Sequence, residues 1–269
     1  MSEAELQQKI RKRIRESERR LTLTDLQKEL SCHKRTEKKA LRSAIRALID
    51  QSEIMYVTEE GHTFIENALN KPVRLSDRVV IKPDNCSFKA GIGDVVINLG
   101  DGISFGRGQH ATTRLCLGGL EALIRLQPEL AVMEHTSVLD IGTGSGILII
   151  AAVQMGLNQG IGIDVDPISI SEAQKNVHIN NLADRITISS QPFESIDAAF
   201  DLIMANLRWP TLDSYLPKMA SNLNTRGLLL LSGIQRQEQE AMVQAGAQNK
   251  LQLLWQKEEK GWAALGFSK

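Results

Sequence analysis

The sequence predicts a doubly wound α/β domain with a seven-stranded sheet, preceded by a small α+β domain. An apolar strand runs directly into a glycine turn and an apolar helix at residues 138–155. A second strand then ends in an acid, Asp164, and strand and helix patterns alternate from there to the C-terminus. Residues 1–72 carry three helical patterns and a hairpin instead, so we predict two domains, 1–72 and 73–269.

The first elements of the N-terminal domain are predicted to be helices. Apolar residues spaced four apart indicate a helix at 3–20. Thr24-Asp25-Leu26-Gln27 has the pattern of a capping box, and we expect it to open a second, short helix. A third helix should extend to about Asp50. Four basic residues at spacings of four, three and four are expected on one outward face of that helix: Arg35, Lys39, Arg42 and Arg46.

Two alternating segments, 54–57 and 62–65, follow and indicate a β-hairpin. Three helices followed by a hairpin resemble a winged helix. One interpretation is a module that binds nucleic acid, because basic residues outnumber acidic ones in this region. The other is a module that contacts protein, because Glu59 and Glu60 at the hairpin tip would repel phosphates. We favour protein contact, because the polar face of the third helix also lacks an obvious set of base-reading side chains.

Composition argues against several classes of protein. The 269 residues include 32 basic and 32 acidic side chains, so no global field attracts the chain to nucleic acid or to a membrane. The three cysteines are far apart and the histidines are not paired, so we expect neither a metal site nor a disulfide framework. No apolar run reaches membrane-spanning length, and the first twenty residues are too charged for a signal peptide. We therefore expect a cytoplasmic protein without a membrane partner.

Residues 73–110 are expected to form lead-in strands and a loop. Segments 79–83 and 94–99 are rich in β-branched residues, and turn-forming residues separate them. A glycine-containing loop at 105–109 then leads to Thr113, near the start of a helix. A hydroxyl and the free N–H groups at a helix start can hold a carboxylate, although a threonine there is more commonly an ordinary N-cap.

A turn with three alternating glycines, Gly142, Gly144 and Gly146, predicts a ligand site after the first strand of the sheet, because glycine lets a ligand approach the backbone closely. A dinucleotide site needs Gly-x-Gly-x-x-Gly, and here the third glycine comes one residue too early. Asp140, just before the turn, would repel a diphosphate and attract a cation. S-adenosylmethionine is a cationic ligand that also has a ribose, and Asp164 is placed to accept hydrogen bonds from ribose hydroxyls. The alternative is a turn that only packs the helix against the strand.

The remaining pattern completes the sheet. We expect helices at 169–180, 212–223 and 235–247, strands at 185–190, 201–205 and 227–232, and a closing antiparallel hairpin within 251–267. One strand of this hairpin should be a reversed edge strand. Asn206 directly follows the fourth strand, so it is expected at the same rim as Gly142 and Asp164. Its alternative role is to cap the end of that strand.

Several motifs carry a family resemblance: 105–113, 140–146, 163–167, 205–206, 231–234 and 258–264. Together they resemble the ribosomal protein L11 methyltransferase family, which has a Rossmann-like sheet and is a class I S-adenosylmethionine-dependent methyltransferase family, over about residues 78–269. The resemblance implies cofactor contacts from Thr113, Gly142, Asp164 and Asn206. Arg107 and Ala111 depart from the family pattern. The family's N-terminal substrate-recognition domain is also missing, with the winged-helix-like module in its place.

The resemblance implies transfer of a methyl group from S-adenosylmethionine to an amino group of a protein, ribosomal in the family. We expect the Asn206 side chain and the Leu207 backbone carbonyl to orient the acceptor amine, because catalysis of this kind consists mostly of placement. Trp209 is expected either to wall the acceptor channel or simply to pack. Two rival functions remain: an RNA methyltransferase that grips RNA through the basic N-terminal module, and a winged-helix regulator that senses the cofactor.

Overall fold

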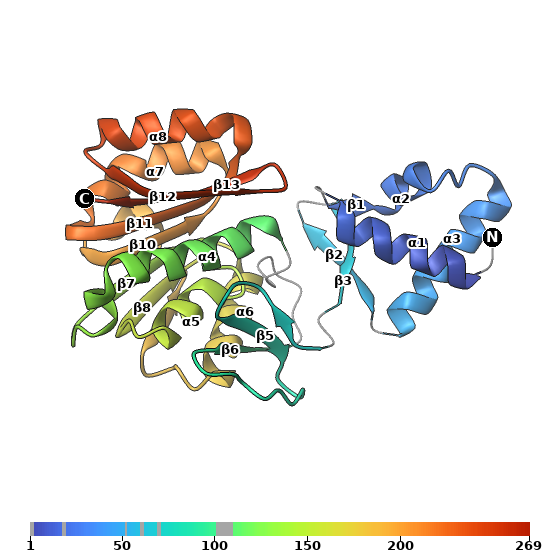
Figure 1. The fold of residues 1–269 in the computed structure, drawn as a ribbon, viewed down its shortest axis with the longest axis horizontal. Coiled ribbons are helices and arrows are strands. Elements are labelled where there is room, and N and C mark those ends of the chain that lie inside the picture. The colour runs from blue at the N-terminus through green and yellow to red at the C-terminus, as the bar shows by residue number, and fades with distance from the viewer. Residues whose placement is uncertain (1–2, 18–19, 52, 60–61, 69–70, 101–109) are drawn as a thin grey trace. The chain divides into compact units, whose positions relative to one another are not determined.

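The chain forms two compact units, Met1–Lys71 and Pro72–Lys269 (Figure 1). The structure is a computed structural model, and the residues it describes are 3–17, 20–51, 53–59, 62–68, 71–100 and 110–269. Within these ranges no helix combines the length and the apolar character needed to cross a bilayer.

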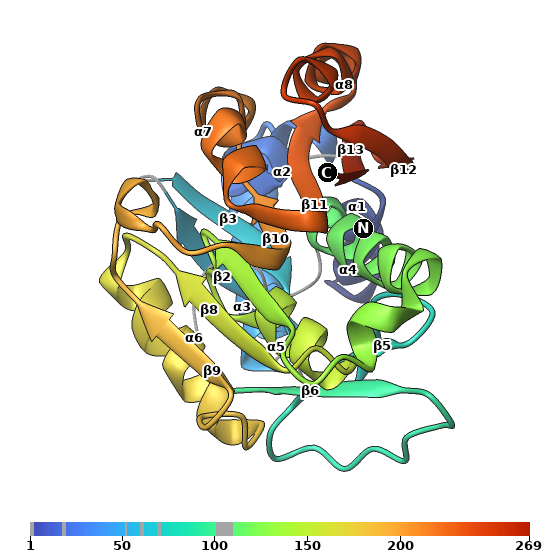
Figure 2. The same cartoon turned by 90° about the vertical axis from the view of Figure 1, so that its left-hand side faces the viewer.

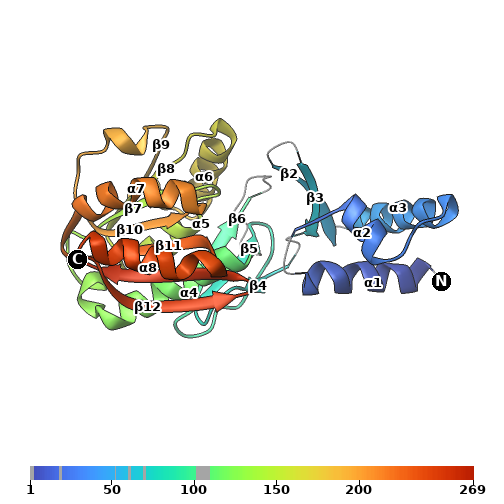
Figure 3. The same cartoon turned by 90° about the horizontal axis from the view of Figure 1, so that it is seen from above.

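The N-terminal unit packs three helices against a small antiparallel sheet (Figure 3). Its elements are α1 (Glu3–Glu16), β1 (Leu21–Thr22), α2 (Leu23–Glu29), α3 (Arg35–Asp50), β2 (Ile54–Glu59) and β3 (His62–Asn67). β3 lies between β1 and β2. The three helices and the hairpin are present as predicted, although α1 ends before the predicted residue 20. Of the predicted hairpin tip, residues 60–61 lie outside the described residues, and the winged-helix assignment stays a prediction.

The second helix begins earlier than predicted, because the capping box is formed by Thr22 and not by Thr24. The Thr22 hydroxyl accepts a hydrogen bond from the Asp25 amide at 3.2 Å, and the Asp25 carboxylate accepts one from the Thr22 amide at 3.0 Å. A capping residue needs an extended backbone, which Thr22 has at the end of β1, whereas Thr24 lies inside α2. The basic face of α3 is as predicted, since all four of its residues are exposed: Arg35, Lys39, Arg42 and Arg46.

The C-terminal unit contains a seven-stranded sheet in the order β12-β13-β11-β10-β7-β8-β9. Its strands are β7 (Ser137–Ile141), β8 (Gln159–Ile163), β9 (Ile186–Ser189), β10 (Phe200–Asn206), β11 (Leu223–Gln235), β12 (Gln252–Glu259) and β13 (Trp262–Ser268). All pairs are parallel except those that involve β13.

The predicted doubly wound sheet is confirmed, but the reversed strand is not at its edge. β13 is the reversed strand, and it lies between β11 and β12. The residues in the middle of β13 are buried and apolar, whereas β12 exposes Lys257 and Glu258. An edge strand tolerates charges that an interior strand does not, and this difference explains why the first strand of the hairpin takes the edge.

Helices cover both faces of the sheet (Figures 1 and 2). One face carries α4 (Ala111–Leu126), α5 (Ile147–Gln154) and α6 (Pro167–Ile179), and the other carries α7 (Trp209–Ser221) and α8 (Gln239–Gln248). Figure 2 shows α6 beside β9 at one edge of the sheet. The last helix begins later than the predicted residue 235, because a short 3-10 turn occupies Arg236–Glu238.

The lead-in segment forms a sheet of its own, in the order β4-β5-β6. Its strands are β4 (Val73–Arg74), β5 (Val79–Pro83) and β6 (Val95–Leu99), which confirms the two strands predicted there. Residues 101–109, which include the predicted glycine loop with Arg107, lie outside the described residues.

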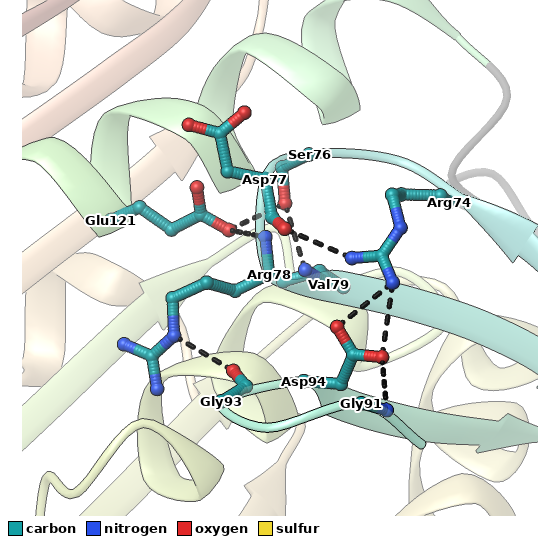
Figure 4. Close-up of polar contacts among 9 residues, drawn as sticks. All are labelled: Arg74, Ser76, Asp77, Arg78, Val79, Gly91, Gly93, Asp94 and Glu121. Atoms are coloured by element: carbon teal, nitrogen blue, oxygen red, sulfur yellow. Dashed lines mark hydrogen bonds and ion pairs between the residues drawn. The ribbon is translucent and has the colours of Figure 1, made fainter. Parts of the chain in front are cut away.

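Polar contacts attach this small sheet to α4 (Figure 4). Glu121 of α4 is buried, and one of its carboxylate oxygens accepts hydrogen bonds from the Ser76 hydroxyl at 2.6 Å and from the Arg78 amide at 2.9 Å. Within the lead-in, Arg74 donates to both carboxylate oxygens of Asp94, at 2.8 and 3.0 Å. The lead-in therefore helps to hold the helix whose first turn borders the site described next.

Candidate active site

Three adjacent parallel strands bring the predicted residues to one edge of the sheet. β10, β7 and β8 are paired in register up to their last residues. Gly142 follows the end of β7, Asp164 follows the end of β8, and Asn206 is the last residue of β10. Parallel strands present their carboxyl ends at the same edge, and this is where open α/β sheets bind ligands.

The glycine turn has a backbone that side chains would obstruct. Gly142, Gly144 and Gly146 have φ angles of +72°, +54° and +80°, in the left-handed region that favours glycine. A Cβ on Gly142 would lie only 2.6 Å from Leu207 Cδ2. The turn is fixed to β8 by a hydrogen bond from the Gly142 amide to the Ile163 carbonyl at 2.9 Å. The backbone at this point therefore leaves no room for a side chain on Gly142.

Asp164 shapes the turn and keeps further acceptor capacity. Its Oδ2 accepts a hydrogen bond from the Gly144 amide at 2.9 Å, and its Oδ1 accepts one from the Asp166 amide at 3.0 Å. The side chain is half-buried at the edge of the sheet. Because each carboxylate oxygen has two lone pairs, Asp164 can still accept hydrogen bonds from a ligand such as a ribose.

Asp140 is a buried carboxylate with one unused oxygen. It is 0% exposed, and its Oδ2 accepts a hydrogen bond from the Thr143 hydroxyl at 2.7 Å. Its Oδ1 is buried and has no hydrogen-bond partner among the described residues. Burial raises the pKa of Asp140 to about 7; the Asp164 charge adds to this shift, and the Thr143 hydroxyl and the Ile149 backbone amide oppose it. A buried carboxylate oxygen without a partner is costly, and a cationic ligand would stabilise it.

Thr113 presents a second unused polar atom. It is 1% exposed, and its hydroxyl has no hydrogen-bond partner among the described residues. The N-cap of α4 is His110, whose ring accepts a hydrogen bond from the Thr112 amide at 3.3 Å and lies 2.8 Å from the Thr112 hydroxyl. The alternative role of Thr113 as the N-cap is therefore wrong, and its hydroxyl is left for another partner.

Helix α4 packs against β11, β12 and β13 and against α5, the helix that follows the glycine turn. Cys116 is fully buried one turn after Thr113. Burial raises the pKa of the Cys116 thiol, and the nearby Asp140 carboxylate raises it further. Helix α5, which follows the glycine turn, contacts both α4 and β7. The two unused oxygens therefore belong to elements that α5 connects.

Two residues near the predicted site, Arg208 and His110, contact Trp262 at the start of β13. The Asn206 side chain is half-buried and has no hydrogen bond to any described residue. Arg208 places its guanidinium 5.5 Å from the ring centre of Trp262, and the His110 ring meets the same indole edge-on at 5.4 Å. Trp209 packs against the hydrophobic core, in agreement with the packing alternative.

The Leu207 carbonyl lies against the next strand. A Cβ on Gly233 would be 2.2 Å from the Leu207 oxygen, and Gly233 has a φ of +83°. The Leu207 amide donates to the Ser232 carbonyl at 3.1 Å. These contacts fix the backbone that follows Asn206, so the position of its side chain relative to the glycine turn is set by β10 and β11.

Comparison with known proteins gives consistent matches. The family model described as ribosomal protein L11 methyltransferase matches residues 5–269, so the match extends into the N-terminal unit, beyond the 78–269 expected from motifs. The protein of that name from Geotalea uraniireducens is 33% identical over 201 residues, which are 73% of this chain and 64% of the relative. The one from Trichlorobacter lovleyi is 40% identical over 176 residues, which are 65% of this chain and 57% of the relative.

The chain thus spans less than two thirds of the length of these curated relatives. A solved structure also matches, that of the ribosomal protein L11 methylase from Lactobacillus delbrueckii subsp. bulgaricus. It has a TM-score of 0.65 and 30% sequence identity, and the match covers 74% of this chain and 98% of the solved one.

Proposed function

The chain belongs to the ribosomal protein L11 methyltransferase family, a family of S-adenosylmethionine-dependent enzymes, and we propose that it methylates an amino group of a protein. The observation that carries this proposal is the unpartnered Oδ1 of Asp140, buried beside a glycine turn that a side chain would block. An anionic oxygen held in this way is suited to a cationic ligand and unsuited to a diphosphate.

The residues present fit S-adenosylmethionine. Asp140 would accept a hydrogen bond from its ammonium group, Asp164 would accept from its ribose hydroxyls, and the Thr113 hydroxyl would donate to its carboxylate. Gly142, Gly144 and Gly146 would let it lie against the backbone. When bound, the cofactor supplies an electrophilic methyl group on a sulfonium.

Asn206 is the residue that we assign to the methyl acceptor. Its side chain stands at the end of β10 without a hydrogen bond to any described residue, so its amide oxygen is available to accept one from an amine. That hydrogen bond would point the nitrogen lone pair toward the cofactor, which is the placement that this chemistry needs. Asn206 also borders the glycine turn and is assigned a cofactor contact. The guanidinium of Arg208 would disfavour the protonated form of an approaching amine, which has no lone pair.

A protein acceptor is supported by the names of the relatives, and ribosomal protein L11 of the same organism is the first acceptor to test. The test is incubation with methyl-labelled cofactor and a lysate, followed by nuclease or protease. Label that resists nuclease and is lost to protease supports the proposal, and label lost to nuclease supports the RNA methyltransferase instead. The variant Asn206→Ala is the control, because it should remove labelling. A protein that binds no S-adenosylmethionine would refute the proposal.

A second role is favoured for the N-terminal unit by the basic face of α3. Arg35, Lys39, Arg42 and Arg46 are exposed, and none forms an ion pair within the described ranges. Like charges at a spacing of four destabilise a helix, so these four residues do not stabilise α3. A bound polyanion would neutralise their charges. We propose that it contacts nucleic acid. The affinity for an RNA or DNA duplex should fall steeply with salt, and a salt-independent affinity would favour the protein-contact interpretation.

A further inference from the structure

One buried side chain on α6 joins the glycine turn to the lead-in sheet. Asn176 is 0% exposed. Its Nδ2 donates to the Ser145 carbonyl, inside the glycine turn, at 2.8 Å. Its Oδ1 accepts a hydrogen bond from the Gly100 amide, directly after β6, at 3.0 Å. A single amide therefore connects two backbone segments that are far apart in the sequence.

We propose that Asn176 is a positioning residue, which holds the glycine turn in the conformation that binds the cofactor. This inference rests on the proposed function. The peptide unit is planar, so fixing the Ser145 carbonyl also fixes the amide of Gly146. That amide donates to the Thr143 carbonyl at 2.9 Å and closes the turn. Asn176 thus sets the orientation of the peptide from which α5 begins.

The packing of α6 supports this role. A Cβ on Gly146 would lie 3.3 Å from the Cβ of Ala173, so α6 rests directly on the turn. Asn176 lies three residues after Ala173 and therefore on the same face of the helix. The other anchors of the turn, the Ile163 carbonyl and the Asp164 carboxylate, come from β8 and the residue after it. Asn176 adds an anchor from α6.

The next turn of α6 offers a matched comparison. Asn180 is also buried, and it forms two hydrogen bonds with β6. Its Oδ1 accepts one from the Asn98 amide at 2.9 Å, and its Nδ2 donates one to the Asn98 carbonyl at 2.7 Å. Both asparagines therefore anchor β6 or its end, but only Asn176 has a hydrogen bond to the glycine turn. A role that is merely structural would be shared by the two residues.

The test replaces each asparagine with aspartate, in the full chain. An ionised Asp keeps an acceptor oxygen for the backbone amide and has no donor, so at a pH where it is ionised Asn176→Asp loses the bond to Ser145. Asn180→Asp then loses the bonds from its Nδ2 to the Asn98 and Asn176 carbonyls, which lie outside the turn. The affinity for S-adenosylmethionine is measured by calorimetry, which needs no acceptor, and the melting temperature is measured beside it. We expect both variants to have a lower melting temperature than the wild type. Asn176→Asp should weaken cofactor binding at least about tenfold, and Asn180→Asp should change it by less than about threefold.

The sign of the charge makes this comparison stringent. An ionised aspartate would itself attract a cationic cofactor, and Asn180→Asp adds the same charge one turn farther along α6, so a loss of affinity confined to Asn176→Asp points to the turn. Equal losses in the two variants, or unchanged binding in Asn176→Asp, would overturn the inference and leave the proposed function intact. If the aspartate variants do not fold, Asn176→Ala and Asn180→Ala are compared and the same difference is expected. A wild-type protein that does not bind the cofactor would overturn both proposals.

Discussion

The buried carboxylate of Asp140 leads to a prediction about pH. Burial raises its pKa from the usual 3.8 to about 7, so near neutral pH a large fraction is protonated in the free protein. A cationic ligand beside Oδ1 favours the ionised form, so binding should release a proton. Because only the ionised fraction binds well, the apparent affinity follows that fraction. The affinity for S-adenosylmethionine should therefore rise about eightfold between pH 6 and pH 7.5.

The same shift gives the sign of a stability effect. Between pH 3.8 and about 7 the folded protein keeps a proton on Asp140 that the unfolded chain has lost. Stability therefore falls as pH rises through this interval, by about 1.4 kcal/mol per pH unit. Asn cannot ionise, so the stability of Asp140→Asn does not fall with pH for this reason. Relative to the wild type, the variant should gain about 3 kcal/mol between pH 5 and pH 8.

Two assays test this reasoning. Calorimetry with the cofactor at pH 6 to 7.5 stays below the pKa of about 7.7 to 8.0 of a typical α-amino group, so the ligand remains cationic. Repeating it in buffers of different ionisation enthalpy measures the released proton. Urea unfolding of the wild type and of Asp140→Asn at pH 5 to 8 measures how the free energy of unfolding of each changes with pH. An affinity that does not change with pH, together with normal cofactor binding by Asp140→Asn, would refute the assignment.

Other substitutions test the remaining parts of the site. Gly142→Ala should cost about 1–3 kcal/mol in urea unfolding, because φ is +72° and the new Cβ would meet Leu207 at 2.6 Å; unchanged unfolding would contradict this. Thr113→Val removes a buried hydroxyl without a partner among the described residues, so the melting temperature should not fall. Cofactor affinity by calorimetry should drop about tenfold, and an unchanged affinity would remove Thr113 from the site. Asn206→Ala should lower methyl transfer in a labelled-cofactor assay by about a hundredfold, well beyond its effect on cofactor binding; equal effects would make Asn206 a cofactor contact only.

The arrangement of the site could be predicted where it follows from strand order. Gly142, Asp164 and Asn206 end or follow strands that read clearly as apolar runs, and parallel strands leave such residues at one edge. The cap of α2 cannot be predicted from the sequence, because two threonines precede Asp25 and only the backbone conformation decides between them. The position of the reversed strand cannot be predicted either, because alternation alone does not tell which strand of a hairpin pairs with the rest of the sheet.

What could not be predicted is the support around the site. Trp262 begins a strand at the far end of the chain, and only the hairpin geometry brings it to Arg208 and His110. Asn176 lies in a helix whose pattern reads as an ordinary amphipathic one, and nothing local reveals that its amide crosses to Ser145. Such contacts depend on how elements pack, which hydrophobic periodicity does not encode.

The glycine turn shows why its own residues could be predicted from the sequence while the residues that hold it in place could not. Its own residues are recognisable in the sequence, because positive φ angles and close approach require glycine at fixed spacing. The turn is nevertheless held by groups outside it, the Asp164 carboxylate on one side and the Asn176 amide on the other. Glycine gives the turn its shape at the cost of rigidity, and rigidity must then come from anchors farther along the chain. A methyltransferase that depends on the placement of its cofactor therefore needs both the glycines and the anchors. A glycine turn without its anchors would bind the cofactor less well than its motif suggests.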